Sequence, residues 1–309
     1  MDGDTATRKR TDDDRGGGRA TTPWETHHSR APVDDSRARV NNLAPMDPPR
    51  LHIDVDGTGP TVALLHGFGG SARNFGPQMR ALKDRHRVVR YDARGHGRSD
   101  APREASAYTP EIFVDDMRRV LDEVGAERAV VGGLSMGAGI ALRFALAHPD
   151  RTRGLILCAF PAGADDPRGF AGKAMGFAET IERAGLETAG EGYVWGPTTR
   201  LDRRAVQFVR QGFLEHPPHG LALTLRGVIA KQPSVAAMHA DVARIQCPAI
   251  VVVGSEDAPS LAASRALATA LPQGDLVIVP GAGHVINLQK PDDVSVAMAE
   301  FLDAIARAA

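Results

Sequence analysis

Short, nearly continuous apolar runs alternate with amphipathic stretches through most of this 309-residue chain. The apolar runs are rich in β-branched residues, and the stretches between them repeat their apolar positions with a helical period. Such alternation predicts an α/β fold in which helices cover both faces of a doubly wound parallel sheet. The expected strands are 51–55, 62–65, 87–91, 129–132, 155–159, 249–253 and 276–279, and the expected helices are 71–83, 110–124, 136–147, 261–271 and 291–306.

One interval interrupts this alternation. Between the fifth and sixth expected strands, about 90 residues contain no convincing strand, although helical periodicity recurs near 170–184, 202–213 and 221–229. An insertion of this length predicts a helical cap, at about residues 161–240. Open α/β sheets bind their ligands beyond the carboxyl ends of the strands, so a cap placed there would cover the site.

The first 49 residues differ from the rest of the chain. They combine a Gly16-Gly17-Gly18 run with short charge runs and scattered prolines, and they show no apolar periodicity. A segment that buries so little apolar surface does not offset its ordering entropy, and it lacks the apolar core of a secretory signal. We therefore expect residues 1–49 to be a disordered N-terminal tail and residues 50–309 to form one folded domain.

Charge and cysteine content exclude several classes of protein. The chain has 37 Lys and Arg against 38 Asp and Glu, and the lack of a basic excess predicts no nucleic-acid partner. No apolar run approaches the roughly 18 residues of a transmembrane helix, so we expect no membrane insertion. Cys158 and Cys247 fit neither a disulfide framework nor a metal spacing. These features predict a cytoplasmic protein with no bound metal.

The strongest chemical motif is Gly133-Leu134-Ser135-Met136-Gly137. It directly follows the apolar run 129–132 and directly precedes the expected helix 136–147. In this strand–turn–helix context, a Gly-x-Ser-x-Gly motif is typical of a nucleophile elbow. The glycines allow a sharp turn without Cβ clashes, so that a strained Ser135 presents its hydroxyl above the sheet. We therefore expect Ser135 to be a catalytic nucleophile.

A serine hydroxyl needs a neighbouring base to act as a nucleophile. Of the 11 histidines, His284 stands out because it lies in a Gly-rich loop, 280–284, directly after the last expected strand. This loop would place its imidazole at the same rim of the sheet as Ser135. The acid that orients the imidazole is expected to be Asp257, which follows the strand 249–253, with Glu256 as the alternative.

Acyl transfer also requires donors for the developing oxyanion. The backbone N–H of Met136, at the start of the helix after the elbow, is one expected donor. The other is the backbone N–H of Phe68, in the Gly-rich loop His66-Gly67-Phe68-Gly69-Gly70 that follows the strand 62–65. We expect His66 to pack beneath that loop rather than to transfer protons.

Taken together, these segments and the stretch 91–99, Tyr-Asp-Ala-Arg-Gly-His-Gly-Arg-Ser, resemble the α/β-hydrolase superfamily. They occur in the superfamily's order and at its intervals, and they cover the chain from about residue 51 onward. The resemblance implies an α/β-hydrolase fold with a mostly parallel sheet and an inserted helical cap. It also implies that 92–99 is a structural loop in which Arg94 and His96 tie neighbouring turns.

Within the superfamily, the stretches 87–102 and 287–291 resemble those of esterase and enol-lactonase members. Haloalkane dehalogenases and epoxide hydrolases resemble the chain overall but have Asp at the position of Ser135. No Trp follows His284, unlike in many carbon–carbon bond hydrolases of this fold. The cofactor-free haloperoxidases (perhydrolases) share the same triad and stay an alternative, as do the carbon–carbon bond hydrolases.

The sequence therefore predicts a serine hydrolase that cleaves a carboxylic ester or a lactone through an acyl-enzyme, without an organic cofactor or a metal. The expected partner is a small-molecule acyl substrate. A non-catalytic ligand-binding protein on the same fold is the rival from another class. Nine apolar cap residues could line an acyl pocket or could pack the cap helices together: Phe160, Phe170, Met175, Phe177, Tyr193, Trp195, Phe208, Phe213 and Met238.

Overall fold

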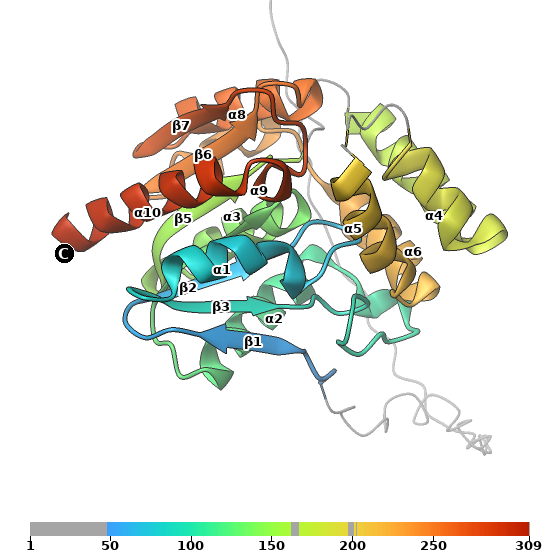
Figure 1. Cartoon of the computed structure of the whole chain (residues 1–309), viewed down its shortest axis with the longest axis horizontal. Coiled ribbons are helices and arrows are strands. Elements are labelled where there is room, and N and C mark those ends of the chain that lie inside the picture. Colours follow the sequence, from blue (N-terminus) through green and yellow to red (C-terminus); the bar gives the residue numbers. More distant parts are fainter. Residues whose placement is uncertain (1–47, 162–166, 197–200, 202, 309) are drawn as a thin grey trace, which may run out of the picture. The chain divides into compact units, whose positions relative to one another are not determined.

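A seven-stranded sheet forms the centre of the fold; six of its strands are parallel to one another, and the first strand, β1, is antiparallel to its single neighbour β3 (Figure 1). The computed structural model describes residues 48–161, 167–196, 201 and 203–308. The doubly wound, mostly parallel sheet predicted from the sequence is confirmed. In the spatial order β1-β3-β2-β4-β5-β6-β7, the strands are β1 (Ile53–Asp56), β3 (Arg87–Tyr91), β2 (Thr61–Leu65), β4 (Ala129–Leu134), β5 (Thr152–Cys158), β6 (Ala249–Gly254) and β7 (Gly274–Val279).

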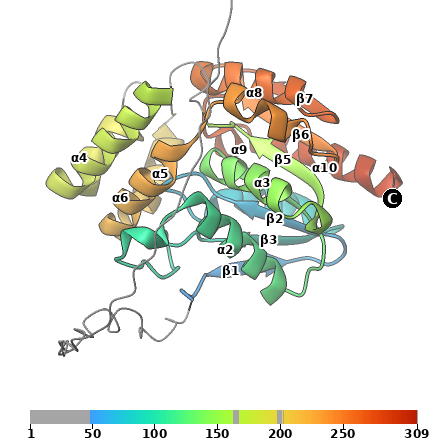
Figure 2. The same cartoon turned by 180° about the vertical axis from the view of Figure 1, so that it is seen from behind.

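Helices cover both faces of the sheet because successive strand residues point to opposite sides. In β2, Val62 and Leu64 belong to the apolar cluster that includes residues of α1 and α10, whereas Ala63 and Leu65 belong to the cluster that includes residues of α2, α3 and α8. Figures 1 and 2 show these two layers from opposite sides. The helices are α1 (Gly76–Leu82) and α10 (Pro291–Ala308) on one face, α2 (Pro110–Glu123), α3 (Met136–Ala147) and α8 (Ala258–Ala270) on the other, and the short α9 (Ile286–Gln289) before α10.

The helical cap occupies the chain between β5 and β6. It contains α4 (Pro167–Tyr193), α5 (Arg203–Leu214), α6 (Pro218–Gly227) and the short α7 (His239–Val242). Helices α4, α5 and α6 lie together beyond the carboxyl ends of the parallel strands (Figure 1). Their apolar side chains form a cluster separate from the two that cover the sheet, and it includes Phe177, Ile181, Trp195, Phe213, Leu221 and Leu225.

The first cap helix is longer than its sequence pattern predicts. The expected helix covers 170–184, but α4 continues to Tyr193 across a kink at Gly185, which has a φ of 81° and a ψ of 175°. A residue in that conformation interrupts the i to i−4 hydrogen bonds, and the two halves therefore do not share one periodic pattern.

The other expected elements are found within a few residues of their predicted ends. Strand β5 stops one residue earlier than expected, because Ala159 adopts a φ of 45°. The expected N-terminal disorder concerns residues that, except for Pro48 and Pro49, lie outside the described part of the chain. Within the described ranges, no helix combines the length and the apolar character needed to cross a membrane.

A buried ion pair ties the loop after β3 to α2. Arg94 donates through Nε and Nη2 to the two carboxylate oxygens of Asp116, at 2.6 and 2.7 Å, and through Nη1 to the carbonyl of Ala107 at 3.0 Å. Arg119 adds a further hydrogen bond to Asp116 at 2.9 Å. The side chains of Arg94 and Asp116 are only 7% and 2% exposed, so water competes little for these contacts.

Replacing Asp116 with Ala should lower the free energy of unfolding by about 3–5 kcal/mol, because it leaves the Arg94 guanidinium buried without its counter-charge. The matched control is Asp115→Ala on the same helix, which removes an exposed ion pair with Arg118 and should cost less than about 1 kcal/mol. Urea unfolding of both variants measures the difference. Equal losses would contradict a structural role for the buried pair.

Candidate active site

The turn between β4 and α3 is a strained elbow. Ser135 has a φ of 52° and a ψ of −109°, a conformation that L-residues other than glycine rarely adopt. A Cβ at either Gly133 or Gly137 would collide with the carbonyl oxygen of Leu65 in β2. The two glycines therefore let the elbow lie directly against the end of β2, while the strained dihedral falls on Ser135 itself.

His284 and Asp257 form a hydrogen-bonded pair. His284 Nδ1 donates to Asp257 Oδ2 at 2.7 Å, and Ser260 Oγ lies 3.3 Å from the same nitrogen. Asp257 is nearly buried, whereas the imidazole is 45% exposed. Glu256 is exposed, and the hydrogen bond of the imidazole goes to Asp257. Sequence reasoning missed Ser260, which reaches the pair because it lies three residues after Asp257 in the first turn of α8.

The pKa of the Asp257 carboxyl reflects opposing effects. Burial alone would raise this pKa, but the hydrogen bond and charge of His284, together with hydrogen bonds from Ser260, outweigh the burial. The pKa of Asp257 therefore lies below its ordinary value of 3.8. Asp257 is thus an ionised carboxylate at neutral pH, able to stabilise a positive charge on the imidazole of His284.

Ser135 and the His284–Asp257 pair lie at one rim of the sheet, because they follow the carboxyl ends of β4, β6 and β7. Within the described ranges, no hydrogen bond joins Ser135 Oγ to His284. Backbone hydrogen bonds hold the strand ends together at this rim: Ser135 N to Cys158 O at 2.8 Å, Ala159 N to Val252 O at 2.7 Å, and Ser255 N to Val279 O at 2.9 Å.

The backbone amides of Phe68 and Met136 lie in the two turns at this rim, and neither donates a hydrogen bond within the described part of the chain. Met136 is the first residue of α3, so its N–H has no acceptor within the helix. Phe68 lies in a tight turn closed by a 3.0 Å hydrogen bond from Gly70 N to Gly67 O. A Cβ at Gly67 would lie only 3.3 Å from the carbonyl oxygen of Leu134, so this turn adjoins the elbow.

Three buried histidines, His66, His96 and His216, support the loops behind this rim. Their rings are neighbours, with centroids 5.1 Å apart for His66 and His96 and 5.3 Å for His96 and His216. His66 Nδ1 donates to Gly67 O at 2.7 Å, and its Nε2 accepts from Ala93 N at 3.0 Å. His66 thus links the loop after β2 to the loop after β3.

His216 makes a similar link from the cap, with Nε2 at 2.9 Å from Gly69 O and Nδ1 at 2.7 Å from Gly97 N. No local sequence signal marks this role, because His216 is more than a hundred residues from both partners. Among the described residues, no group of His, Cys, Asp and Glu could hold a metal ion.

Burial keeps all three histidines neutral. It lowers the pKa of His66, lowers that of His96 well below the ordinary value, and lowers that of His216 to about 4. Repulsion from a charge on a neighbouring histidine ring also lowers the pKa of His96 and of His216.

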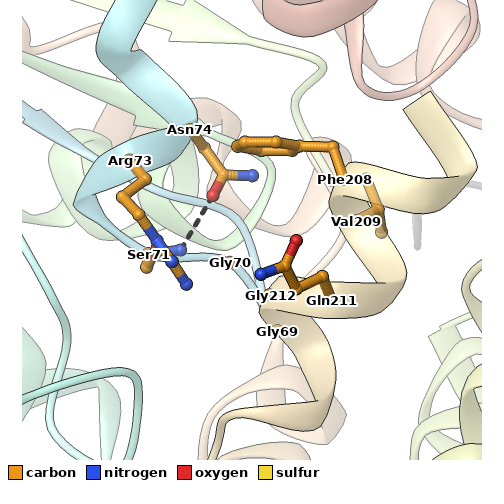
Figure 3. Close-up of a pocket in the computed structure, with 9 residues that line it drawn as sticks. All are labelled: Gly69, Gly70, Ser71, Arg73, Asn74, Phe208, Val209, Gln211 and Gly212. Atoms are coloured by element: carbon orange, nitrogen blue, oxygen red, sulfur yellow. Dashed lines mark hydrogen bonds between the residues drawn. The ribbon is translucent and has the colours of Figure 1, made fainter. Parts of the chain in front are cut away.

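A small pocket lies between the loop after β2 and helix α5 (Figure 3). Arg73 at its edge forms an ion pair with Glu215, which follows α5, and so joins the loop to the cap. Gly69, Gly70, Ser71, Arg73 and Asn74 line one side of the pocket, and Phe208, Val209, Gln211 and Gly212 line the other.

The nine apolar residues considered for an acyl pocket separate into groups, apart from Phe170, which is half-buried near the start of α4. Most of the buried ones pack against each other or against the main core, as expected if they hold the cap together. Phe208 is 43% exposed and lines the pocket beside α5. Phe177, Trp195 and Phe213 belong to the cap cluster, Phe160 and Met238 to the core beside the sheet, and Met175 and Tyr193 are exposed.

The sheet order, the helices on both faces and the inserted cap define the α/β-hydrolase fold. A model described as the alpha/beta hydrolase family matches residues 62–297, and the chain therefore belongs to that family.

Solved structures and sequence relatives agree with this assignment. An esterase from Thermogutta terrifontis superposes with a TM-score of 0.76 and 31% identity, over 85% of this chain and 96% of that one. The enol-lactonase from Burkholderia xenovorans superposes with a TM-score of 0.72 and 26% identity, over 82% and 97%. A putative carbamate hydrolase, RutD, from a Caulobacter species is 31% identical over 250 residues, 78% of this chain and 90% of the relative. These names support a hydrolase activity and the esterase and enol-lactonase branch predicted from the sequence.

Acid should destabilise the protein between pH 6.5 and about 4. His216 has a pKa of about 4 when folded, against an ordinary 6.5. As the pH falls below 6.5, the unfolded chain binds a proton that the folded protein does not, so stability present above pH 6.5 is progressively lost. Protonation of His216 alone should lower the free energy of unfolding by about 3 kcal/mol over this pH range.

Urea unfolding at pH 7.5 and 4.5 measures this effect. His216→Gln should reduce the difference in unfolding free energy between the two pH values by about 2–3 kcal/mol. His239→Gln, at an exposed position of α7, is the control and should leave the difference unchanged. The same pH dependence in all three proteins would contradict a buried, neutral His216.

Proposed function

We propose that the protein is a serine hydrolase that cleaves a carboxylic ester or a lactone through an acyl-enzyme. The observation that carries the proposal is the hydrogen bond between His284 and Asp257 at the same rim as the strained Ser135 elbow. A nucleophile, a base and an acid that orients the base are the three groups that this chemistry requires.

In the proposed mechanism, Ser135 Oγ attacks the carbonyl carbon of the substrate while His284 Nε2 takes the hydroxyl proton. His284 is half-exposed, so Nε2 can meet both the serine and a substrate. The resulting imidazolium returns the proton to the leaving alkoxide as the tetrahedral intermediate collapses to the acyl-enzyme. Water then attacks the ester carbonyl by the same sequence of proton transfers and releases the acid.

The remaining groups stabilise charge during these steps. The Asp257 carboxylate, with its lowered pKa, holds the Nδ1 proton of His284 and stabilises the imidazolium. The backbone amides of Phe68 and Met136 donate to the oxyanion of the tetrahedral intermediate. Amides without a protein partner, at the elbow and in the turn beside it, are available for that role.

The substrate class rests on the relatives. The esterase and the enol-lactonase align with more than four-fifths of this chain, and both names describe cleavage of an ester bond, open or cyclic. The carbamate hydrolase relative suggests that a carbamate carbonyl is within reach of the same chemistry. A serine at position 135 disfavours the epoxide hydrolase and dehalogenase reactions, for which the related enzymes have Asp there.

Two alternatives use the same three side chains. A perhydrolase would form a peracid from the acyl-enzyme and hydrogen peroxide faster than water releases the acid. A carbon–carbon bond hydrolase would break a bond between the attacked carbonyl carbon and a neighbouring carbon. A non-catalytic binding protein on this fold would have no reason to keep a serine in a strained elbow beside a histidine and a carboxylate.

Ser135→Ala should reduce hydrolysis of p-nitrophenyl esters at least about 10³-fold and should abolish labelling by a fluorophosphonate probe. Ser106→Ala, an exposed serine in a short turn, is the matched control and should behave as wild type. Equal ester hydrolysis by the wild type and Ser135→Ala would refute the proposal.

Asp257→Asn should lower kcat by about 10⁴-fold with the fold intact, because the amide no longer selects the Nδ1–H tautomer of His284 or stabilises its charge. Glu256→Gln, the same change one residue earlier at an exposed position, should alter kcat less than threefold. Comparable losses in the two variants, measured as kcat on one ester, would contradict the role assigned to Asp257.

A further inference from the structure

His216 is a buried residue of the cap, yet both of its ring nitrogens bond to loops of the sheet domain. The residue lies between α5 and α6 and is 4% exposed. Its Nδ1 is 2.7 Å from Gly97 N, in the loop after β3, and its Nε2 is 2.9 Å from Gly69 O, in the loop after β2. No step of the proposed hydrolysis uses this imidazole.

The two partners determine which nitrogen of His216 carries the proton. The backbone N–H of Gly97 can only donate, so Nδ1 must accept, and the carbonyl of Gly69 can only accept, so Nε2 must donate. Only the neutral Nε2–H tautomer satisfies both. The groups that face the ring are His66, His96, Asp92 and Arg73, and burial is the largest of the effects that keep His216 neutral.

These hydrogen bonds continue to the amide of Phe68. The carbonyl that accepts from His216 Nε2 belongs to the same peptide unit as the N–H of Gly70. That N–H donates to Gly67 O at 3.0 Å, and the Gly67 carbonyl belongs to the same peptide unit as the N–H of Phe68. Each donor in the series, from Gly97 N through His216 Nε2 and Gly70 N, thus donates to the next peptide or ring, and the series ends at the N–H of Phe68.

Such a chain orients and polarises its last member. In a trans peptide the C=O and N–H are antiparallel, so a hydrogen bond accepted by the carbonyl fixes the direction of the N–H and strengthens it as a donor. His66 Nδ1 also donates to Gly67 O, at 2.7 Å. The Phe68 peptide is therefore held from two sides, by His66 from the sheet domain and through Gly70 by His216 from the cap.

The packing of the cap holds His216 in place. Phe213, one helical turn earlier, packs on Gly69, where a Cβ would lie 2.6 Å from its ring and where φ is 67°. Its ring also contacts those of Phe68 and His216, with centroids 6.5 and 6.3 Å away. On the other side, Gly220 meets Gly95 so closely that a Cβ on Gly220 would lie 2.6 Å from Gly95 O.

We propose that His216 is a positioning residue through which the cap orients the backbone N–H of Phe68 as an oxyanion donor. The proposal rests on the serine hydrolase function above. It gives the connection between α5 and α6 a part in catalysis, in addition to its place in the cap that covers the site. The consequence is a contribution to kcat, because the oxyanion exists only in the transition state and the intermediate.

Three substitutions separate the hydrogen bonds of His216 from its packing. The amide nitrogen of Gln can replace Nε2 as the donor to Gly69 O, whereas the amide oxygen of Asn can replace Nδ1 as the acceptor from Gly97 N. Phe keeps the ring contacts and neither hydrogen bond. The proposal predicts that His216→Gln keeps kcat within about threefold of wild type. His216→Asn and His216→Phe should lower kcat about 10- to 100-fold with little change in KM, somewhat less than loss of a whole oxyanion donor.

Steady-state kinetics on one p-nitrophenyl ester, with circular dichroism to check folding, gives the result. A role in packing alone predicts the opposite order, with Phe closest to wild type. That order, or equal kcat in all variants while Ser135→Ala is inactive, would overturn the positioning role and leave the hydrolase function standing. Ester hydrolysis that does not depend on Ser135 would overturn both.

The wild-type protein allows a second measurement that needs no variant of His216. Nitrogen-15 NMR of the imidazole groups should show one buried histidine fixed as the Nε2–H tautomer from pH 8 to pH 5. An Nδ1–H tautomer for His216, or a titration near pH 6.5, would break the chain of donors and overturn the proposal.

Discussion

The close approach of the elbow to the end of β2 is the constraint on which the site depends. Gly133 and Gly137 leave no room for a Cβ beside the carbonyl oxygen of Leu65, so the turn between β4 and α3 must be narrow. The narrow turn forces the positive φ onto Ser135, and the first amide of α3 has no acceptor among the described residues. It also allows the loop after β2 to lie against the elbow, where a Cβ on Gly67 would be only 3.3 Å from the carbonyl oxygen of Leu134. A packing restriction between two backbones thereby arranges the groups that the proposed chemistry uses.

The second constraint at this rim is that its buried backbone N–H and C=O groups need hydrogen-bond partners. The loops after β2 and β3 carry peptide groups that no strand or helix pairs, and an unpaired buried peptide group is costly. Neutral histidines meet this demand because one ring nitrogen donates while the other accepts. His66 does so from within the sheet domain, and His216 does so from the cap. The cap thus completes the loops that it covers.

Sequence reasoning located most of the fold because its signals are local. The strand–helix alternation, the Gly-rich loops and the Gly-x-Ser-x-Gly turn each lie within a short window, and each predicted element has a counterpart in the structure. The reasoning failed where one residue interrupts a period, as Gly185 does within α4. It also missed Ser260 and His216. Ser260 carries no motif, and His216 acts on Gly69 and Gly97, which are more than a hundred residues away.

Local sequence was enough to specify the order of strands and helices and the position of the cap, and it supplied the side chains that the proposed mechanism uses. These follow from short-range preferences for turns, caps and alternating burial, which each window of residues expresses on its own. Contacts between distant parts of the chain determined the remaining features of the site. They selected Asp257 over Glu256 as the partner of His284, directed most aromatic cap residues into packing, and fixed the tautomer of His216. Each of these outcomes depends on contacts between residues that are far apart in the sequence. The free energy of such a contact depends on its burial, which exists only in the folded structure.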